Sequence, residues 1–264
     1  MGSRPLGRRL LAEFLGTGLL VTAVVGSGIA ASRLSPGDTG LELLENAIAT
    51  AAALVALIFA FGPVSGAHFN PVVTTADRVL GGISGADAAG YIGAQVSGAM
   101  GGALLANTMF ALPTLEASTK TRSSGPLWLA EVVATFGLVV VILGVVRSGR
   151  PAVAPLAVGA YIAGAYFFTS STSFANPAVT LGRTVTDTFA GIRLSSAPAF
   201  VAAEVVGGAL AVAAVKVLYP GLAGLDPDVV LRGADGAGTS GATTEATAPV
   251  SAGTTTEAAP PGAP

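Results

Sequence analysis

Long apolar runs separated by short polar breaks dominate the sequence. Six of these runs are long enough to cross a bilayer, because about 20 apolar residues in a helix span the roughly 30 Å of hydrocarbon. They cover residues 10–32, 43–62, 86–110, 127–146, 152–170 and 197–219. The pattern therefore predicts an all-α membrane protein with six transmembrane helices.

Two shorter segments, one after the second run and one after the fifth, interrupt this pattern. Each begins with Asn-Pro, at Asn70-Pro71 and at Asn176-Pro177. Asn is a favoured helix N-cap, and Pro suits the first helical position because its missing N–H is not needed there. Only about a dozen residues follow before the helical pattern ends, which is too few to span the hydrocarbon. Both segments are predicted to be re-entrant half-helices.

The two halves of the chain share motifs in the same order, which indicates an internal duplication. The matching pairs are Ala-Glu at 12–13 and 130–131, Asn-Pro-x-Val-Thr at 70–74 and 176–180, and Ala-Gln/Glu-Val at 94–96 and 203–205. Each half holds three spans, an odd number, so the second copy must enter the membrane with opposite topology. We therefore expect one domain over residues 10–220, built as an inverted repeat of residues 10–110 and 127–220.

The ends of the chain differ from this domain. Residues 1–9 form a short basic segment. The apolar run that follows it is longer than a typical signal-peptide core, so we interpret that run as a retained span. Beyond Arg232 the composition changes to Ala, Thr, Gly, Pro and Ser, which cannot bury enough apolar surface to fold. Residues 233–264 are predicted to be a disordered tail.

Basic residues in the loops favour one orientation in the membrane. With the N-terminus inside, eight of the 13 Lys and Arg residues fall on the cytoplasmic side and five fall outside. Such an excess follows the positive-inside rule for short loops. We therefore expect a multi-pass protein of the plasma membrane with both termini in the cytoplasm.

Composition supports the membrane assignment and excludes several other classes. Hydrophobic residues make up 52% of the chain and charged residues 11%, so polar residues are too few to coat a soluble protein. The 36 glycines suit close helix packing, and Gly98 and Gly102 form a Gly-x-x-x-Gly face on the third span. With no Cys and one His, thiol chemistry and a His-based metal cluster are excluded. Nothing suggests nucleic acid binding, catalysis, a metal or a cofactor.

The six spans, the paired half-helices, a Glu early in the first and fourth spans, and Ser-Gly-Ala-His-Phe-Asn-Pro at residues 65–71 resemble one family. It is the major intrinsic protein family of aquaporins and aquaglyceroporins, and the resemblance covers residues 8–220. The resemblance implies a homotetramer in which each subunit holds its own pore through the lipid for small neutral solutes. Physically, two half-helix N-termini meeting at mid-membrane each carry about half a positive charge, which repels cations and orients a solute by its oxygen.

Several residues beside this pore are candidates for function. The motif residues are Asn70, Pro71, Val72, Asn176, Pro177 and Ala178. An ionisable group inside a span is by default a functional candidate, such as a proton relay. Glu13 and Glu131 occupy equivalent places in the two halves, so we interpret them instead as acceptors for backbone N–H groups of the loops before the half-helices. His68 either faces the pore or braces its loop.

The resemblance also implies a narrow filter, and there this sequence departs from the family. Most members carry Arg directly after the second Asn-Pro-Ala, where this chain has Val179. Arg183 lies one helical turn further on, at a different position from the family's arginine. The other filter positions, carried over by spacing, are Thr50, Gly164 and either Ser173 or Phe174. Small residues there predict a wider opening, and loss of the arginine removes an electrostatic barrier and a set of donors.

Valine at this filter position resembles the bacterial aquaglyceroporins associated with arsenic resistance. That resemblance implies a passive channel for metalloid hydroxides or methylated arsenicals and polyols, with some water. A plain glycerol or water facilitator is the alternative in the same class. An ion-coupled secondary transporter also uses inverted repeats and broken helices, but its flux would depend on a gradient. A purely structural membrane protein would carry no solute.

Overall fold

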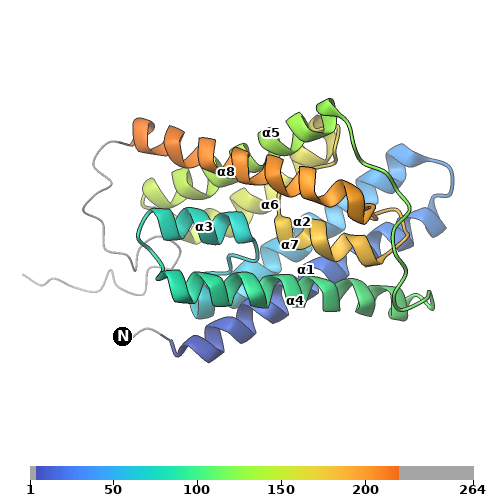
Figure 1. Ribbon diagram of the computed structural model, residues 1–264, viewed down its shortest axis with the longest axis horizontal. Helices are drawn as coiled ribbons and strands as arrows, with labels where there is room; N and C mark the ends of the chain where they lie inside the picture. The colour runs from blue at the N-terminus through green and yellow to red at the C-terminus, as the bar shows by residue number, and fades with distance from the viewer. Residues whose placement is uncertain (1–3, 220–264) are drawn as a thin grey trace, which may run out of the picture. The chain divides into compact units, whose positions relative to one another are not determined.

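The computed structural model describes residues 4–219, so the predicted tail of residues 233–264 lies outside the described residues. Within residues 4–219 the chain forms helices and connecting turns, without a strand (Figure 1). The helices are α1 (Leu6–Leu34), α2 (Thr39–Ser65), α3 (Pro71–Val79), α4 (Gly85–Met109), α5 (Gly125–Arg147), α6 (Ala154–Phe168), α7 (Pro177–Gly182) and α8 (Ala197–Leu218). Short 3₁₀ turns occur at Pro151–Val153, Arg183–Val185 and Leu194–Ser196. The all-α fold predicted from the sequence is confirmed.

Five segments are long and apolar enough to cross a membrane by length and composition: α1, α2, α5, and α6 and α8, each with the 3₁₀ turn before it. The third expected span, α4, is rich in Gly, Ala and Ser and is therefore less apolar than the others. Its 25 residues nevertheless give a helix of about 38 Å, enough to span the hydrocarbon. It packs along α1 in the first half as α8 packs along α5 in the second.

The two half-helices begin at the Asn-Pro motifs. The Asn70 side chain accepts a hydrogen bond from the N–H of Val72 (2.9 Å), which caps α3. Asn176 caps α7 in the same way, through the N–H groups of Ala178 (3.0 Å) and Val179 (3.3 Å). Pro follows each Asn at the first helical position, as its fixed backbone angle favours. Neither half-helix is long enough to cross a bilayer.

The half-helices meet between the long helices. Figure 1 shows α3 and α7 lying end to end, and both contact α4 and α8. The packing is repeated between the halves, because α1 contacts α2 and α4 while α5 contacts α6 and α8. The described residues therefore form two similar four-helix units whose half-helices share one centre.

Glycine allows the closest helix contacts. A Cβ atom at Gly98 would overlap the backbone carbonyl of Phe14, and one at Gly102 would overlap that of Gly18. Gly207 approaches the carbonyl of Val132 in the same manner where α8 crosses α5. The predicted Gly-x-x-x-Gly contact face on the third span is confirmed, and its partner is α1.

This contact makes Gly98 sensitive to the smallest substitution. We expect Gly98→Ala to destabilise the protein by about 1–3 kcal/mol, because the added methyl group forces α1 and α4 apart. The measurement is the thermal unfolding midpoint of the detergent-solubilised protein. Gly101→Ala is the matched control, since a Cβ atom there meets no atom within 4 Å. Equal midpoints for the two variants would contradict the expectation.

Candidate pore

Two short loops lead into the half-helices, and both hold non-glycine residues in the left-handed region. The residues are Ala67 and Phe69 in the first loop and Thr172, Ser173 and Ala175 in the second, with φ between +49° and +65°. Each such residue costs on the order of 1–3 kcal/mol unless the surroundings compensate. Alternation of left-handed and other conformations can turn successive backbone N–H groups toward one anion. The loops therefore require buried acceptors.

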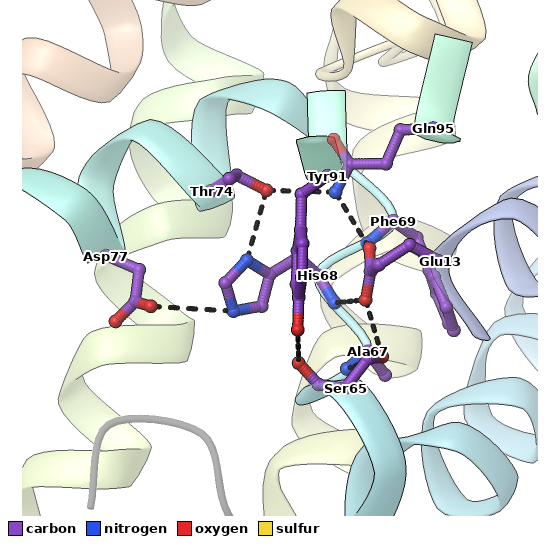
Figure 2. Close-up of polar contacts among 9 residues, drawn as sticks. All are labelled: Glu13, Ser65, Ala67, His68, Phe69, Thr74, Asp77, Tyr91 and Gln95. Atoms are coloured by element: carbon purple, nitrogen blue, oxygen red, sulfur yellow. Dashed lines mark hydrogen bonds and ion pairs between the residues drawn. The ribbon is translucent and has the colours of Figure 1, made fainter. Parts of the chain in front are cut away.

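Glu13 of α1 is the acceptor for the first loop. Its fully buried carboxylate accepts hydrogen bonds from the backbone N–H groups of His68 (3.0 Å) and Phe69 (2.8 Å). The side chains of Ser65 (2.6 Å) and Gln95 (2.7 Å) donate two more (Figure 2). Four donors thus converge on one carboxylate, and they tie the loop to α1 and α4.

Glu131 of α5 holds the second loop in the equivalent way. It accepts from the N–H groups of Phe174 (3.0 Å) and Ala175 (2.7 Å). Glu204 of α8 adds a second acceptor, which receives the N–H of Asn176 (3.2 Å) and the hydroxyl of Thr180 (2.6 Å). Gln95 and Glu204 are supporting residues that the site prediction omits, although their matching places in the two halves were a usable signal.

The two cap asparagines cross-connect the loops. The side-chain amide of Asn70 donates to the carbonyl of Ala175, and that of Asn176 donates to the carbonyl of Phe69, both at 2.7 Å. An amide nitrogen carries two hydrogens, so each Asn retains one further N–H. Both residues border a cavity, and these N–H groups are among the donors that the cavity can offer to an oxygen atom.

His68 makes contacts that brace its loop. Its Nδ1 lies 3.0 Å from the hydroxyl of Thr74, and its Nε2 lies 3.7 Å from a carboxylate oxygen of Asp77 (Figure 2). Its ring meets that of Tyr91 edge to face, with 5.3 Å between the centroids. His68 is also one of the residues that border the cavity. His68 therefore contacts neighbours of its loop and also borders the cavity.

The cavity lies where the two halves meet and has a volume of about 80 Å³. One water molecule needs roughly 10–15 Å³ by the same measure, so several fit. Apolar side chains form most of the wall: Leu20, Val24, Leu54, Ile58, Val73, Leu138, Ile142, Val158 and Ile162. Polar groups are fewer and come from both halves: Thr50, His68, Asn70, Tyr166, Ser173, Asn176 and Arg183. The arrangement suits a small solute with a few hydroxyl groups.

Most of the expected filter residues border this cavity. Thr50, Val179 and both candidates from the second loop, Ser173 and Phe174, are among its lining residues. The remaining motif residues lie elsewhere. Pro71, Val72 and Pro177 border a separate apolar pocket between the half-helices, α4 and α8, and Ala178 is fully buried.

The prediction for Gly164 is wrong. Gly164 is exposed on the outer side of α6, where its nearest neighbour is the ring of Phe168. The cavity side of α6 carries Val158, Ile162 and Tyr166, which recur every four residues and so share one helix face. Tyr166 borders the cavity instead, and its hydroxyl donates to that of Thr50 (3.2 Å).

A polar connector between the halves covers the loop that follows α7. The N–H of Ser118 donates to the carbonyl of Thr184 (3.0 Å), and Asp187 accepts from the N–H (3.0 Å) and hydroxyl (2.9 Å) of Thr119. These hydrogen bonds lower the pKa of the Asp187 carboxyl, because they favour its charged form. Partial burial lowers the pKa of the Lys120 ammonium. The connector is thus attached to the loop that follows α7.

These features define a class of protein. Bilayer-length helices surround two half-helices, the N-termini of the half-helices meet at paired Asn amides, and a cavity borders both amides. This combination describes a multi-pass membrane channel whose pore is built by an inverted repeat.

Comparison with known proteins identifies the family. The family model of the major intrinsic proteins matches residues 2–175, about two thirds of the chain, and the chain belongs to this family. Its aquaporins are channels for small neutral solutes and not enzymes.

Individual relatives agree with this assignment. Aquaglyceroporin AqpS of Rhizobium meliloti (strain 1021) is 53% identical over 211 residues, 80% of this chain and 90% of that protein. Glycerol uptake facilitator protein-like 6 of Lactiplantibacillus plantarum is 35% identical over 164 residues, 59% of this chain and 72% of that protein. The X-ray structure of the aquaglyceroporin from Plasmodium falciparum shares the fold, with a TM-score of 0.65, 21% identity, and coverage of 83% of this chain and 99% of that one.

The buried carboxylates lead to a prediction about stability. We expect Glu131→Gln to cost about 1–3 kcal/mol, because the amide retains one acceptor oxygen and leaves one buried N–H of the second loop unpaired. The measurement is the unfolding free energy in mixed detergent and denaturant. Glu116→Gln, on the exposed connector, is the control and should leave stability unchanged. A Glu131→Gln variant as stable as the control would contradict the role assigned to this carboxylate.

Proposed function

We propose that this channel conducts metalloid hydroxides or methylated arsenicals and polyols passively, with some water. The observation that carries the proposal is Val179, which borders the cavity directly after the second Asn-Pro-Ala. An apolar side chain there leaves space where an arginine would fill the opening and bind water. We assign the filter to Thr50, Ser173, Phe174 and Val179, with Tyr166 in place of Gly164.

The chemistry of the wall supports neutral hydroxylated solutes. Asn70 and Asn176 offer amide donors, and the hydroxyls of Thr50 and Tyr166 can donate or accept. The rest of the wall is largely apolar, and an ion would lose its hydration there at a high cost that a neutral solute avoids. Pore diameter and lining groups are what set selectivity in aquaporin-type channels. The names of two relatives, an aquaglyceroporin and a glycerol uptake facilitator-like protein, also favour solutes of this class.

The alternative of an ion-coupled transporter is less well supported. Coupling through Glu13 would require a carboxylate that is free to bind and release a cation or proton. Glu13 instead accepts four hydrogen bonds that hold the first loop. We therefore assign Glu13 and Glu131 a structural role beside the motif residues Asn70, Pro71, Val72, Asn176, Pro177 and Ala178.

We further propose the arrangement of this protein in the cell. The conducting unit comprises residues 10–220 and forms a homotetramer in the plasma membrane, with residues 1–9 and the C-terminus in the cytoplasm. Large apolar side chains project from several helices, among them Leu19, Ile48, Phe59, Val133 and Phe167, and suit contact with lipid or neighbouring subunits. The excess of basic residues in the loops assigned to the cytoplasm supports the orientation.

Restoring the arginine tests the proposal. We expect Val179→Arg to lower the permeability to arsenous acid and glycerol by about tenfold while water still passes, because the long side chain narrows the opening and binds water. Stopped-flow light scattering on proteoliposomes measures all three fluxes. Val179→Leu is the control for added volume without charge. If Val179→Arg leaves every permeability unchanged, the filter assignment is refuted; if the wild type passes glycerol and water but no arsenous acid, the protein is a plain glycerol facilitator.

A further inference from the structure

We propose that Arg183 is the cationic specificity residue of this pore. It excludes cations and donates hydrogen bonds to solute oxygens one helical turn beyond the position where most family members carry arginine. The inference rests on the proposed function only in taking the cavity as the conducting pathway.

The placement of Arg183 is the first support. It follows α7 directly, is only 3% exposed, and borders the cavity together with Val179 and Phe174. Its guanidinium carbon lies 3.4 Å from the centroid of the Phe174 ring. Its Nε donates a hydrogen bond to the carbonyl of Ala190. Stacking and hydrogen bonding together hold the charged group at the height of the second re-entrant loop.

No carboxylate of the described residues lies within ion-pairing distance of this group. Neither Arg183 nor its neighbour Arg122 forms an ion pair with a carboxylate of residues 4–219. Arg122 also lies over the Phe174 ring, at 5.2 Å, and donates from Nε to the carbonyl of Gly191. Among residues 4–219, Arg183 donates one hydrogen bond from its side chain, which has five N–H donors. The other four donors are available to a ligand.

Such a group creates a barrier to cations. Charge interactions are strong where low-dielectric walls border a narrow space, because little water screens them. Apolar side chains such as Ile162 and Val179 border this cavity beside Arg183. A cation would therefore be repelled here, whereas the oxygen atoms of a neutral hydroxylated solute would be bound by the unused donors.

The contact between Arg183 and Phe174 has a counterpart in the first half of the chain. Phe174 lies two residues before the cap Asn176 and Arg183 seven after it; His68 and Asp77 occupy the same places around Asn70. His68 and Asp77 also contact one another, at 3.7 Å. Asp77 is not among the residues that border the cavity, whereas Arg183 is. The second half therefore uses a contact common to both halves to present a cation to the pore.

This assignment changes one expectation from the sequence. Loss of arginine at position 179 was expected to remove both the electrostatic barrier and the donors. With Arg183 in the wall, both are retained while Val179 keeps the opening wide. The pore can thus combine passage of larger neutral solutes with exclusion of cations.

Cation flux tests the inference directly. Sodium and proton entry into proteoliposomes is measured with fluorescent dyes under an imposed membrane potential for the wild type, Arg183→Gln, Arg183→Met and Arg183→Lys. We expect the two neutral variants to increase cation entry by about tenfold or more and Arg183→Lys to remain tight, because the neutral variants lose the positive charge that Lys keeps. Arg183→Met preserves the contact with the Phe174 ring if Arg183→Gln fails to fold. Arg193→Gln, an exposed residue outside the cavity wall, is the control for charge.

The outcomes separate this inference from the proposed function. If the neutral variants exclude cations as well as the wild type does, or if the wild type itself leaks cations, Arg183 is not the barrier. Arsenous acid and glycerol flux through the wild type decides the proposed function independently. The double variant Val179→Arg/Arg183→Gln should exclude cations again, and a leak there equal to that of Arg183→Gln would contradict a purely electrostatic barrier.

Discussion

Backbone polar groups inside a membrane must find partners within the protein, and this constraint governs the whole architecture. The long helices satisfy it by themselves, but the two loops before the half-helices do not. Glu13 and Glu131 solve the problem by accepting consecutive N–H groups from each loop. A charged side chain buried in each half would be costly alone, and here the donors that surround it compensate.

The rest of the pore follows from loops fixed in this way. Because the loops hold their left-handed residues, the cap asparagines meet at the centre and each amide reaches the opposite loop. The half-helices then direct their N-termini and remaining amide donors toward one place. Close glycine contacts, such as Gly98 against Phe14, bring α1 and α4 near enough for Gln95 to donate to Glu13, which holds the first loop.

Sequence patterns predicted the helices and half-helices because hydrophobic length and helix caps are local properties. The filter was less predictable. Gly164 was placed by counting back from Asn176, but the path between them includes Thr172 and Ser173 in left-handed conformations. Counting cannot show how such a turn rotates α6, and Tyr166 faces the cavity instead. Arg183 was noticed in the sequence, but its contact with Phe174 depends on two segments that only the tertiary fold brings together.

The reciprocal asparagine bonds also have a consequence for how the protein is made. Their donors and acceptors lie 105 and 107 residues apart in the chain. During synthesis, the first half-helix can enter the membrane long before the carbonyl of Ala175 exists. The Asn70 amide must therefore find another partner, such as water, until the second half arrives. The pore is completed only when the late half of the chain replaces that temporary partner, so assembly of the two halves and formation of the pathway are one event.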